Sequence, residues 1–311
     1  MSHDLQGSTL ASITAIVDRA LDEDAPWGDV TSEAAIPVSA AATARIVSRV
    51  DGVFAGGLPL ELAFTRVEPS VRVEHHLADG DPIAPGTVIA TITGTARGIL
   101  RGERVALNLA QRLSGVATLT RRYVDAVADA VSASGQPVRL VDTRKTTPGL
   151  RVLEKAAVRA GGGHNHRFSL SDAVMLKDNH LAVLKSQGLD LTEAIRAVRS
   201  RIPHTMHLEV EVDRLDQLPA VIAAEPDTIM LDNFSLDDLR AGVARIAGRA
   251  TVEASGGVTL ETVRAIAETG VDVISVGALT HSAPALDLGL DIVIDAAPAG
   301  SGPGDGAGGG R

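Results

Sequence analysis

The sequence predicts an α/β protein whose larger part folds as an α/β barrel. Six apolar runs recur along the second half of the chain, and amphipathic segments with helical spacing separate the later ones. Strands that are each followed by a helix pair in parallel, and about six such units are typical of an α/β barrel. A doubly wound open sheet is the alternative that the same pattern allows. The runs occupy residues 138–142, 173–177, 206–212, 228–232, 251–255 and 272–277.

The first third of the chain has a different pattern. Residues 10–20 place apolar side chains on one face of a short helix. Residues 42–50 and 71–94 contain alternating segments interrupted by Gly and Pro, which is typical of antiparallel strands joined by tight turns. From residue 96 to about residue 131 the apolar spacing is three or four residues, which predicts a long helix.

Two of the later helices have predicted starting points. Asp190 precedes Glu193 by three residues, and Ser235 precedes Asp238 by the same interval. In such pairs the first side chain accepts a hydrogen bond from a free backbone N–H of the first helical turn. The sequence therefore predicts helices that begin next to residues 190 and 235.

The composition excludes several classes of function. The chain contains no Cys, so it has no disulfides, thiolate metal sites or cysteine nucleophiles. Its net charge of −10 and its 2% of aromatic residues argue against a nucleic-acid partner or an anionic membrane surface. No targeting pattern opens the sequence, and no apolar run approaches the roughly 18 residues of a membrane span. We therefore expect a soluble cytoplasmic protein.

Polar residues or glycines follow every predicted strand of the repeating part. In an α/β barrel the catalytic groups project from the carboxyl ends of the strands, so we expect the active site at these positions. The segments are Asp142 to Lys145, Lys177 to His180, Glu209 to Glu211, Asp232 with Asn233, Ser255 to Gly257, and Gly277 with Ala278.

Residues 139–177 form a positive segment in an otherwise acidic chain. They include eight Lys or Arg residues and three acidic residues, a local net charge of +5. Arg144 and Lys145 are adjacent at a strand end, where Arg can bind a carboxylate or phosphate through two hydrogen bonds. Arg167 and Lys177 flank a predicted buried strand, where an unpaired charge is costly unless an anion meets it. The segment therefore predicts a site for small anions.

Three further basic residues of this segment have the spacing of a helix surface. Because Arg151, Lys155 and Arg159 recur every four residues, we interpret them as solvated side chains of a helix. The glycines at 161–163, which precede His164 and His166, allow a ligand to approach the backbone closely.

Glu211 and Asp232 end the two strands that follow the positive segment. Two carboxylates at this position can coordinate Mg²⁺ or contact a ribose, because Mg²⁺ prefers oxygen ligands and retains waters and substrate phosphates. A salt bridge to the positive segment is the alternative interpretation. The glycine turns at 254–258 and 276–280 follow the last two strands and match the phosphate-binding turns of α/β barrels.

Longer motifs resemble one enzyme family. TRKTTPG at 143–149 and GGGHNHR at 161–167, followed in order by LKDNH, EVEVD, LDNF, EASGGV and VGALTHS, closely resemble the quinolinate phosphoribosyltransferases. EDAPWGDVTS and GERVALNLAQRLSG, nearer the N-terminus, fit the same family, and the resemblance extends from about Leu10 to Ile294. The chain departs from the family at Ala156, where Tyr is common, and at Ala160, where Cys is frequent. Both positions lie on a predicted helix, away from the strand ends.

The resemblance implies a decarboxylating pentosyltransferase of NAD biosynthesis. Such an enzyme converts quinolinate and phosphoribosyl pyrophosphate into nicotinate mononucleotide, pyrophosphate and CO₂. The implied fold is an open or incomplete α/β barrel over residues 118–285 and an N-terminal α/β sandwich domain over residues 1–117, completed by residues near 286–295. The implied assembly is a homodimer in which the first domain of one subunit caps the barrel of the other. Residues 296–311, rich in Gly, Pro and Ala, are expected to form a disordered tail.

The resemblance also implies the roles of individual residues. The quinolinate carboxylates would be bound by Arg144, His166, Arg167 and Lys177, together with Arg104 of the partner subunit. Phosphoribosyl pyrophosphate and its Mg²⁺ would face Lys145, Lys177, Glu211 and Asp232, and the 5′-phosphate would be bound by Ser255, Gly256, Gly277 and His281. Glu211 or Asp232 would stabilise positive charge on the ribose, and Lys177 would assist the loss of CO₂.

Three alternatives stay open at the level of the sequence. The first is a related phosphoribosyltransferase that acts on another aromatic acid, although three converging residues, Arg104, Arg144 and Arg167, favour a substrate with two carboxylates. The second is a Schiff-base aldolase with Lys177 as the nucleophile. The third is a barrel that binds phosphoribosyl pyrophosphate without turnover.

Overall fold

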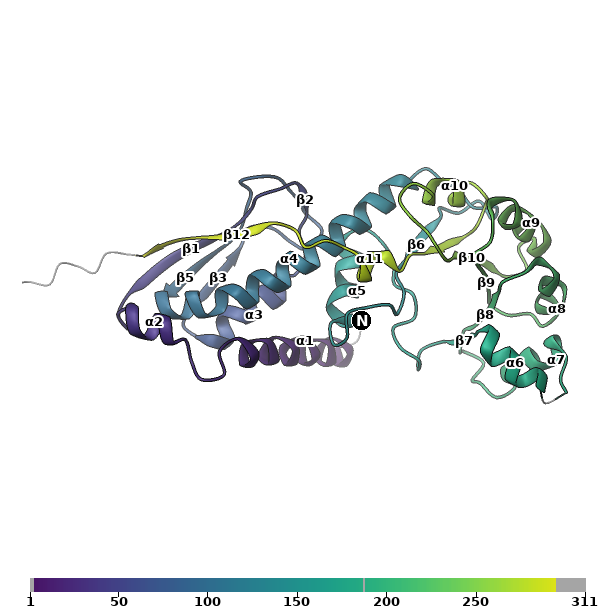
Figure 1. Ribbon diagram of the computed structural model, residues 1–311, viewed down its shortest axis with the longest axis horizontal. Helices are drawn as coiled ribbons and strands as arrows, with labels where there is room; N and C mark the ends of the chain where they lie inside the picture. Colours follow the sequence, from purple (N-terminus) through teal and green to yellow (C-terminus); the bar gives the residue numbers. More distant parts are fainter. Residues whose placement is uncertain (1–2, 187, 295–311) are drawn as a thin grey trace, which may run out of the picture. The chain divides into compact units, whose positions relative to one another are not determined.

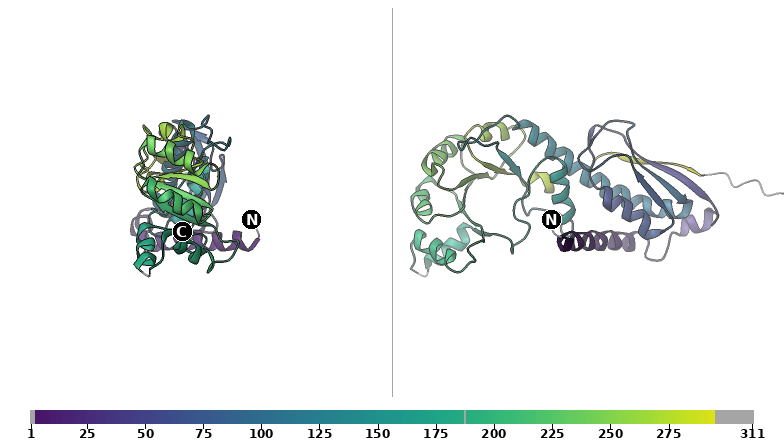
Figure 2. Two further views of the ribbon diagram at one scale, coloured as in Figure 1. Left: turned by 90° about the vertical axis from the view of Figure 1, so that its right-hand side faces the viewer. Right: turned by 180° about the vertical axis from the view of Figure 1, so that it is seen from behind.

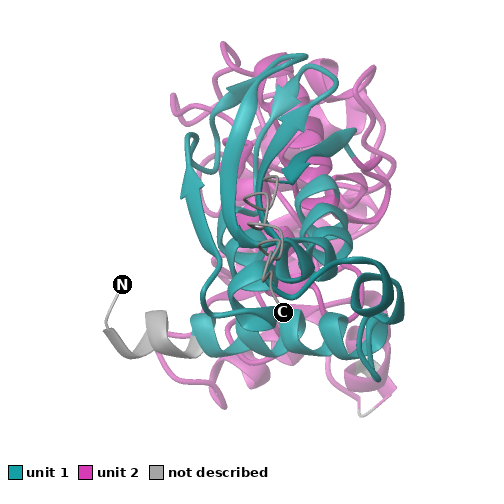
Figure 3. Cartoon of the chain, turned by 90° about the vertical axis from the view of Figure 1, so that its left-hand side faces the viewer, with its two compact units in different colours: residues 1–111, 286–311 teal, residues 112–285 magenta. Residues whose placement is uncertain are grey.

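A computed structural model of the protein describes residues 3–186 and 188–294. The chain forms two compact units, residues 1–111 with 286–311 and residues 112–285 (Figure 3). The division falls inside helix α4 (Ala96–Ala126), whereas the sequence placed the boundary after residue 117. Because α4 is one continuous helix, its periodicity gives no signal of the division. The predicted tail at 296–311 lies outside the described residues.

The first unit contains a four-stranded antiparallel sheet in the order β12-β1-β5-β3. Its C-terminal strand, β12 (Leu288–Ile294), pairs with β1 (Ala41–Ser48), so the end of the chain completes the sheet. Ala42, Ala44 and Ile46 are buried at alternate positions of β1, as the two-residue period requires. The other strands are β3 (Arg72–His75) and β5 (Val88–Thr95), with the short pair β2 (Gly52–Val53) and β4 (Pro82–Ile83).

Helices cover one face of this sheet. Figure 1 shows α3 (Gly57–Val67) and the beginning of α4 along the sheet, where Leu60 and Phe64 of α3 are fully buried. The predicted N-terminal helix is α1 (His3–Asp24), which buries Ile13 and Val17, and α2 is Val30–Ala35. No helix among residues 3–186 and 188–294 has the length and apolar character needed to cross a bilayer.

The second unit contains a six-stranded sheet in the order β6-β11-β10-β9-β8-β7, and every pair in it is parallel. All six predicted strands are present. The strands β6 and β7 form its two edges, and within the described residues no ladder joins them, so the barrel is open (Figure 2). The strands are β6 (Arg139–Val141), β7 (Val174–Leu176), β8 (Leu208–Val212), β9 (Thr228–Asp232), β10 (Thr251–Ser255) and β11 (Val273–Ser275).

Helices connect successive strands of this sheet. Asp190 caps α7 in a reciprocal box with Glu193, and Ser235 caps α9 by accepting from Asp238 N–H at 3.2 Å, so both predicted starts are confirmed. The helices are α5 (Arg151–Ala160), α6 (Asp178–Ser186), α7 (Leu191–Arg199), the 3₁₀ turn η1 (Leu215–Gln217), α8 (Leu218–Ala223), α9 (Leu236–Ile246), α10 (Val263–Ala267) and α11 (Ala278–His281).

The alternation of side chains along these strands separates the core from the site. Leu208, Val210 and Val212 of β8 are fully or almost fully buried on one face, and Glu209 and Glu211 lie on the other. The same period places Asp232 of β9 and Ser255 of β10 in register with each other. Charged and polar side chains of neighbouring strands are therefore gathered on one face of the sheet.

Candidate active site

A cavity of about 530 Å³ lies at the carboxyl ends of the strands of the second unit. Nine of the predicted site residues line it, and they come from segments that are up to 112 positions apart between Arg144 and Gly256. The lining residues are Thr143, Arg144, Lys145, His166, Arg167, Met175, Lys177, Glu211, Met230, Asp232, Asn233, Ser255, Gly256, Gly257 and Ser275.

Three cationic side chains form one side of this cavity. Nη1 of Arg167 donates to Ala173 O at 3.0 Å, and burial together with the neighbouring Arg144 charge lowers the pKa of the Arg167 guanidinium. Nε of Arg144 is buried and finds no hydrogen-bond partner among the described residues. Lys177 is ion-paired with Glu211. An anionic ligand would supply the acceptor that Arg144 lacks and would offset the repulsion between the two guanidinium groups.

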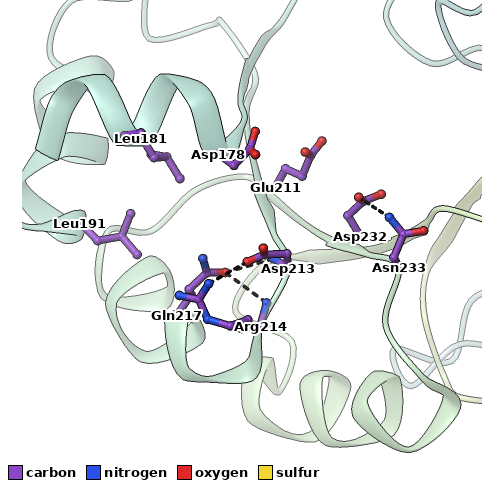
Figure 4. Close-up of a pocket in the computed structure, with 10 residues that line it drawn as sticks. Asp178, Leu181, Leu191, Glu211, Asp213, Arg214, Gln217, Asp232 and Asn233 are labelled. Carbon is purple, nitrogen blue, oxygen red and sulfur yellow. Dashed lines mark hydrogen bonds and ion pairs between the residues drawn. The ribbon is translucent and has the colours of Figure 1, made fainter. Parts of the chain in front are cut away.

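Two carboxylates, of Glu211 and Asp232, also line the cavity. Asp232 Oδ2 accepts from Nδ2 of Asn233 at 2.7 Å, and Asn233 reaches this position through a left-handed φ of 57°. A second cavity of about 500 Å³ shares Glu211, Asp232 and Asn233 and is also lined by Asp178 and Asp213. Figure 4 shows Asp213 beside Arg214 and Gln217, away from Glu211 and Asp232.

The oxygen atoms of these carboxylates suit a magnesium ion. Asp178, Glu211 and Asp232 all line the second cavity, and carboxylate oxygens are ligands that Mg²⁺ prefers. The structure therefore fits the predicted pair Glu211 and Asp232 as candidate ligands. The salt-bridge alternative is confirmed for Glu211, which is ion-paired with Lys177 of the positive segment, whereas Asp232 is hydrogen-bonded to Asn233.

A buried triad of His166, Glu209 and Glu253 lies next to the cavity; the sequence placed Glu209 at a strand end without a role and did not point to Glu253. Nε2 of His166 lies 3.3 Å from Glu209 Oε2 and 3.4 Å from Glu253 Oε2, and both carboxylates are almost fully buried. The two-residue period was the available signal, since Glu209 precedes Glu211 by two residues and Glu253 precedes Ser255 by two.

The contacts of His166 determine what this triad can bind. Burial alone would lower the pKa of His166, but hydrogen bonding to Glu209 and Glu253 raises that pKa to about 10. Arg167 N–H opposes this change, because it donates to Nδ1 at 2.7 Å and so favours the neutral ring with its proton on Nε2. In the charged ring and in the neutral ring alike, Nε2 carries a proton and donates to the carboxylates of Glu209 and Glu253. Nε2 is therefore not free to ligate a metal, although the three groups are close enough to suggest a metal site.

Comparison with known proteins identifies the family. The family model of the quinolinate phosphoribosyl transferase C-terminal domain matches residues 116–291, and that of the N-terminal domain matches residues 29–114. The chain belongs to the quinolinate phosphoribosyltransferase family.

Relatives of this family resemble the chain over most of its length. A probable nicotinate-nucleotide pyrophosphorylase [carboxylating] of Bacillus subtilis is 44% identical over 272 residues, which cover 88% of this chain and 90% of the relative. The Mycobacterium leprae nicotinate-nucleotide pyrophosphorylase [carboxylating] is 43% identical over 282 residues, or 89% and 95% of the two chains. The crystal structure of NadC from Streptococcus pyogenes is 38% identical, with a TM-score of 0.84, and covers 91% of this chain and 96% of that one.

The remaining residues that the family resemblance implies lie outside the cavity lining. A Cβ atom on Gly277 would lie 3.1 Å from both His281 Nε2 and Lys145 Cδ, so Gly277 and His281 are neighbours of the cavity residue Lys145. Thr280 Oγ1 donates to Lys145 O at 2.7 Å and ties the two strand ends together. Arg104 is exposed on α4 in the first unit, so the described second unit does not contain it.

One interpretation from the sequence is wrong. Lys155 does not solvate a helix surface: its side chain is 1% exposed and forms a buried ion pair with Asp142. Helical spacing could not reveal this, because the partner lies on another element, directly after β6. Arg159 donates to Oδ1 of Asn165, and Arg151 donates to Phe168 O at 3.2 Å and to Thr146 Oγ1 at 3.0 Å.

Proposed function

We propose that this chain transfers the phosphoribosyl group of phosphoribosyl pyrophosphate to the ring nitrogen of quinolinate. The products are nicotinate mononucleotide, pyrophosphate and CO₂. The observation that carries the proposal is a single cavity lined by Arg144, Arg167 and Lys177 together with Glu211 and Asp232, in a chain that belongs to the quinolinate phosphoribosyltransferase family.

The charge of the substrates explains the cationic side. Quinolinate brings two carboxylates, and phosphoribosyl pyrophosphate brings a diphosphate and a monophosphate, so the pair needs several fixed cations. We assign the quinolinate carboxylates to Arg144, Arg167 and Lys177, with His166 at the base of this group. We assign the 5′-phosphate to Ser255, Gly256, Gly277 and His281; Lys145 lies beside Gly277 and His281, which supports this assignment.

We assign the carboxylates of Glu211 and Asp232 to the ribose of phosphoribosyl pyrophosphate. As the bond from C1 of the ribose to the pyrophosphate oxygen breaks, positive charge develops on the ring, and the fixed negative charges of Glu211 and Asp232 stabilise it. The quinolinate nitrogen then forms the new bond to C1. Holding both reactants in one cavity supplies much of the rate enhancement, because a bimolecular step becomes effectively unimolecular.

Loss of CO₂ follows from the new bond. The alkylated ring nitrogen is cationic and stabilises the electron pair that remains on the adjacent C2 when the C2–carboxylate bond breaks. A proton from solvent then replaces the carboxylate on C2, which balances the reaction. We assign to Lys177 the task of stabilising the electron pair on C2, because it reaches the cavity beside Arg167 and Met175.

Mg²⁺ and a second subunit complete the proposed site. Glu211 and Asp232 would hold the ion that accompanies the pyrophosphate, directly or through water, and the ion would neutralise charge on the leaving group. Arg104 of the partner subunit would add a further cation to the quinolinate site in a homodimer with shared active sites.

The experiment is a product assay. Purified protein, quinolinate, phosphoribosyl pyrophosphate and Mg²⁺ should yield nicotinate mononucleotide, identified by mass spectrometry, and omission of any substrate should abolish the product. Nicotinate, which lacks the second carboxylate, should be a poor substrate. Turnover of nicotinate or another aromatic acid without turnover of quinolinate would favour the related transferase. Borohydride trapping of Lys177 with a sugar phosphate would favour the aldolase, and binding of phosphoribosyl pyrophosphate without any product would favour the non-catalytic barrel.

A further inference from the structure

Residues 164–167 lie along the edge of the first barrel strand. His164 N–H donates to Leu140 O at 2.8 Å, and Asp142 N–H donates to His164 O at 3.1 Å. Val141 and His164 form a parallel bridge. This short ladder lies at the β6 edge of the open barrel, so it brings His166 and Arg167 to the same side of the cavity as Arg144.

A buried ion pair holds both peptide groups that flank His166. Asp142 Oδ1 accepts from the Lys155 ammonium and from His166 N–H, the latter at 2.9 Å. Lys155 Nζ also donates to His166 O at 3.0 Å. The Asn165 side chain joins the pair, because its Nδ2 donates to Asp142 Oδ2 at 2.6 Å and to Lys155 O at 2.9 Å. The backbone on each side of His166 is therefore fixed by one charge of the pair.

We propose that Asp142 and Lys155 are positioning residues for quinolinate. The buried pair fixes the backbone that presents His166 and Arg167 relative to the strand end that presents Arg144, so the cations converge before the substrate binds. This inference rests on the proposed function of the cavity. Neither Asp142 nor Lys155 lines the cavity, so both act through the residues that do.

Asp142 and Lys155 each bind the backbone of His166 as well as each other, which argues against a purely structural role for the ion pair. A buried ion pair is often no more stable than apolar side chains of the same volume, so its presence alone says little about stability. An apolar pair could not accept from His166 N–H or donate to His166 O. Asp142 is also only two residues before Arg144, so one carboxylate couples the two guanidinium-bearing segments. A displacement of about 1 Å in such a site can cost about a hundredfold in rate.

The test separates positioning from stability. Lys155→Met and Asp142→Asn each leave one buried charge unpaired, so both single variants should lose thermal stability and activity. The double variant Asp142→Asn/Lys155→Met has no unpaired charge and should regain most of the lost thermal stability. Its KM for quinolinate should stay raised about tenfold or more, while its KM for phosphoribosyl pyrophosphate stays within about twofold of wild type.

Arg199→Met provides a control at a partly exposed ion pair outside the cavity lining. It breaks the 2.7 Å ion pair between Arg199 and Asp227, which lies directly before β9 at the opposite ends of the strands. This variant should lower the melting temperature without changing either KM.

Amide hydrogen exchange supplies a readout that does not depend on turnover. The His166 amide should exchange at least about tenfold faster in the folded double variant than in wild type, because its acceptor no longer carries a charge held by Lys155. Wild-type KM for quinolinate and unchanged exchange in the double variant would overturn the inference, as would equal rises in both KM values. An inactive wild-type protein would refute the proposed function instead, and the exchange comparison would still decide whether the pair holds the segment.

Discussion

Gly277→Ala perturbs the proposed phosphate corner without straining the backbone. Gly277 has a φ of −66°, which alanine adopts freely, but its new Cβ would lie 3.1 Å from both Lys145 Cδ and His281 Nε2. Both neighbours are side chains, so they must shift by a few tenths of an ångström while the barrel stays intact. The substitution therefore moves two phosphate-facing groups and leaves the quinolinate side in place.

The expected rise in KM follows from the free energy of the hydrogen bond that the substitution would remove. A hydrogen bond to a charged group contributes about 1.5–3 kcal/mol, so losing one should raise KM for phosphoribosyl pyrophosphate roughly 10- to 150-fold. KM for quinolinate should change less than about twofold, and the free energy of unfolding should change by less than about 0.5 kcal/mol. Initial rates with each substrate varied at saturating levels of the other, together with urea unfolding, measure all three. A rise in KM for quinolinate alone would refute the reasoning.

Three further predictions test other parts of the account. Lys177→Met should lower kcat at least about a hundredfold while phosphoribosyl pyrophosphate still binds by calorimetry, and near-normal kcat would remove Lys177 from the chemistry. Arg104→Ala and Lys177→Ala, each inactive alone, should recover about a quarter of wild-type activity when mixed, because half of the dimers then contain one complete site; no recovery after verified subunit exchange would contradict a shared site. The folded-state pKa of His166 is raised from 6.5 to about 10, so its stabilisation is complete below pH 6.5 and is lost as the pH rises through 10. The free energy of unfolding should therefore fall more steeply across this window in wild type than in His166→Gln, and equal slopes would show that the Arg167 N–H donation to Nδ1 outweighs the two carboxylates and keeps the ring neutral.

Local patterns predicted much of the second unit. The runs 228–232 and 251–255 coincide with β9 and β10, because each apolar run is bounded by polar residues or glycine. The caps at Asp190 and Ser235 depend only on residues three positions away, and both formed as predicted. The residues that line the cavity could also be predicted from the sequence, because parallel strands bring their carboxyl ends to one edge of the sheet.

Contacts between distant segments were not predictable in this way. Lys155 has the spacing of a solvated helix residue, and its burial depends on Asp142, 13 positions earlier at the end of β6. Glu209 and Glu253 lie on the site face by alternation, but their role as partners of His166 depends on a segment that lies beside β6 only in the folded chain. The boundary after Gln111 falls within a continuous helix, where no local signal marks it.

The fate of the C2 carboxylate tests the central claim most directly. Quinolinate labelled with carbon-14 in either the C2 or the C3 carboxylate is incubated with the protein, phosphoribosyl pyrophosphate and Mg²⁺, and released CO₂ is counted. The account predicts labelled CO₂ from the C2-labelled substrate alone, in a one-to-one ratio with nicotinate mononucleotide and only when phosphoribosyl pyrophosphate is present. Absence of labelled CO₂, or its release without phosphoribosyl pyrophosphate, would contradict the proposed transfer to quinolinate.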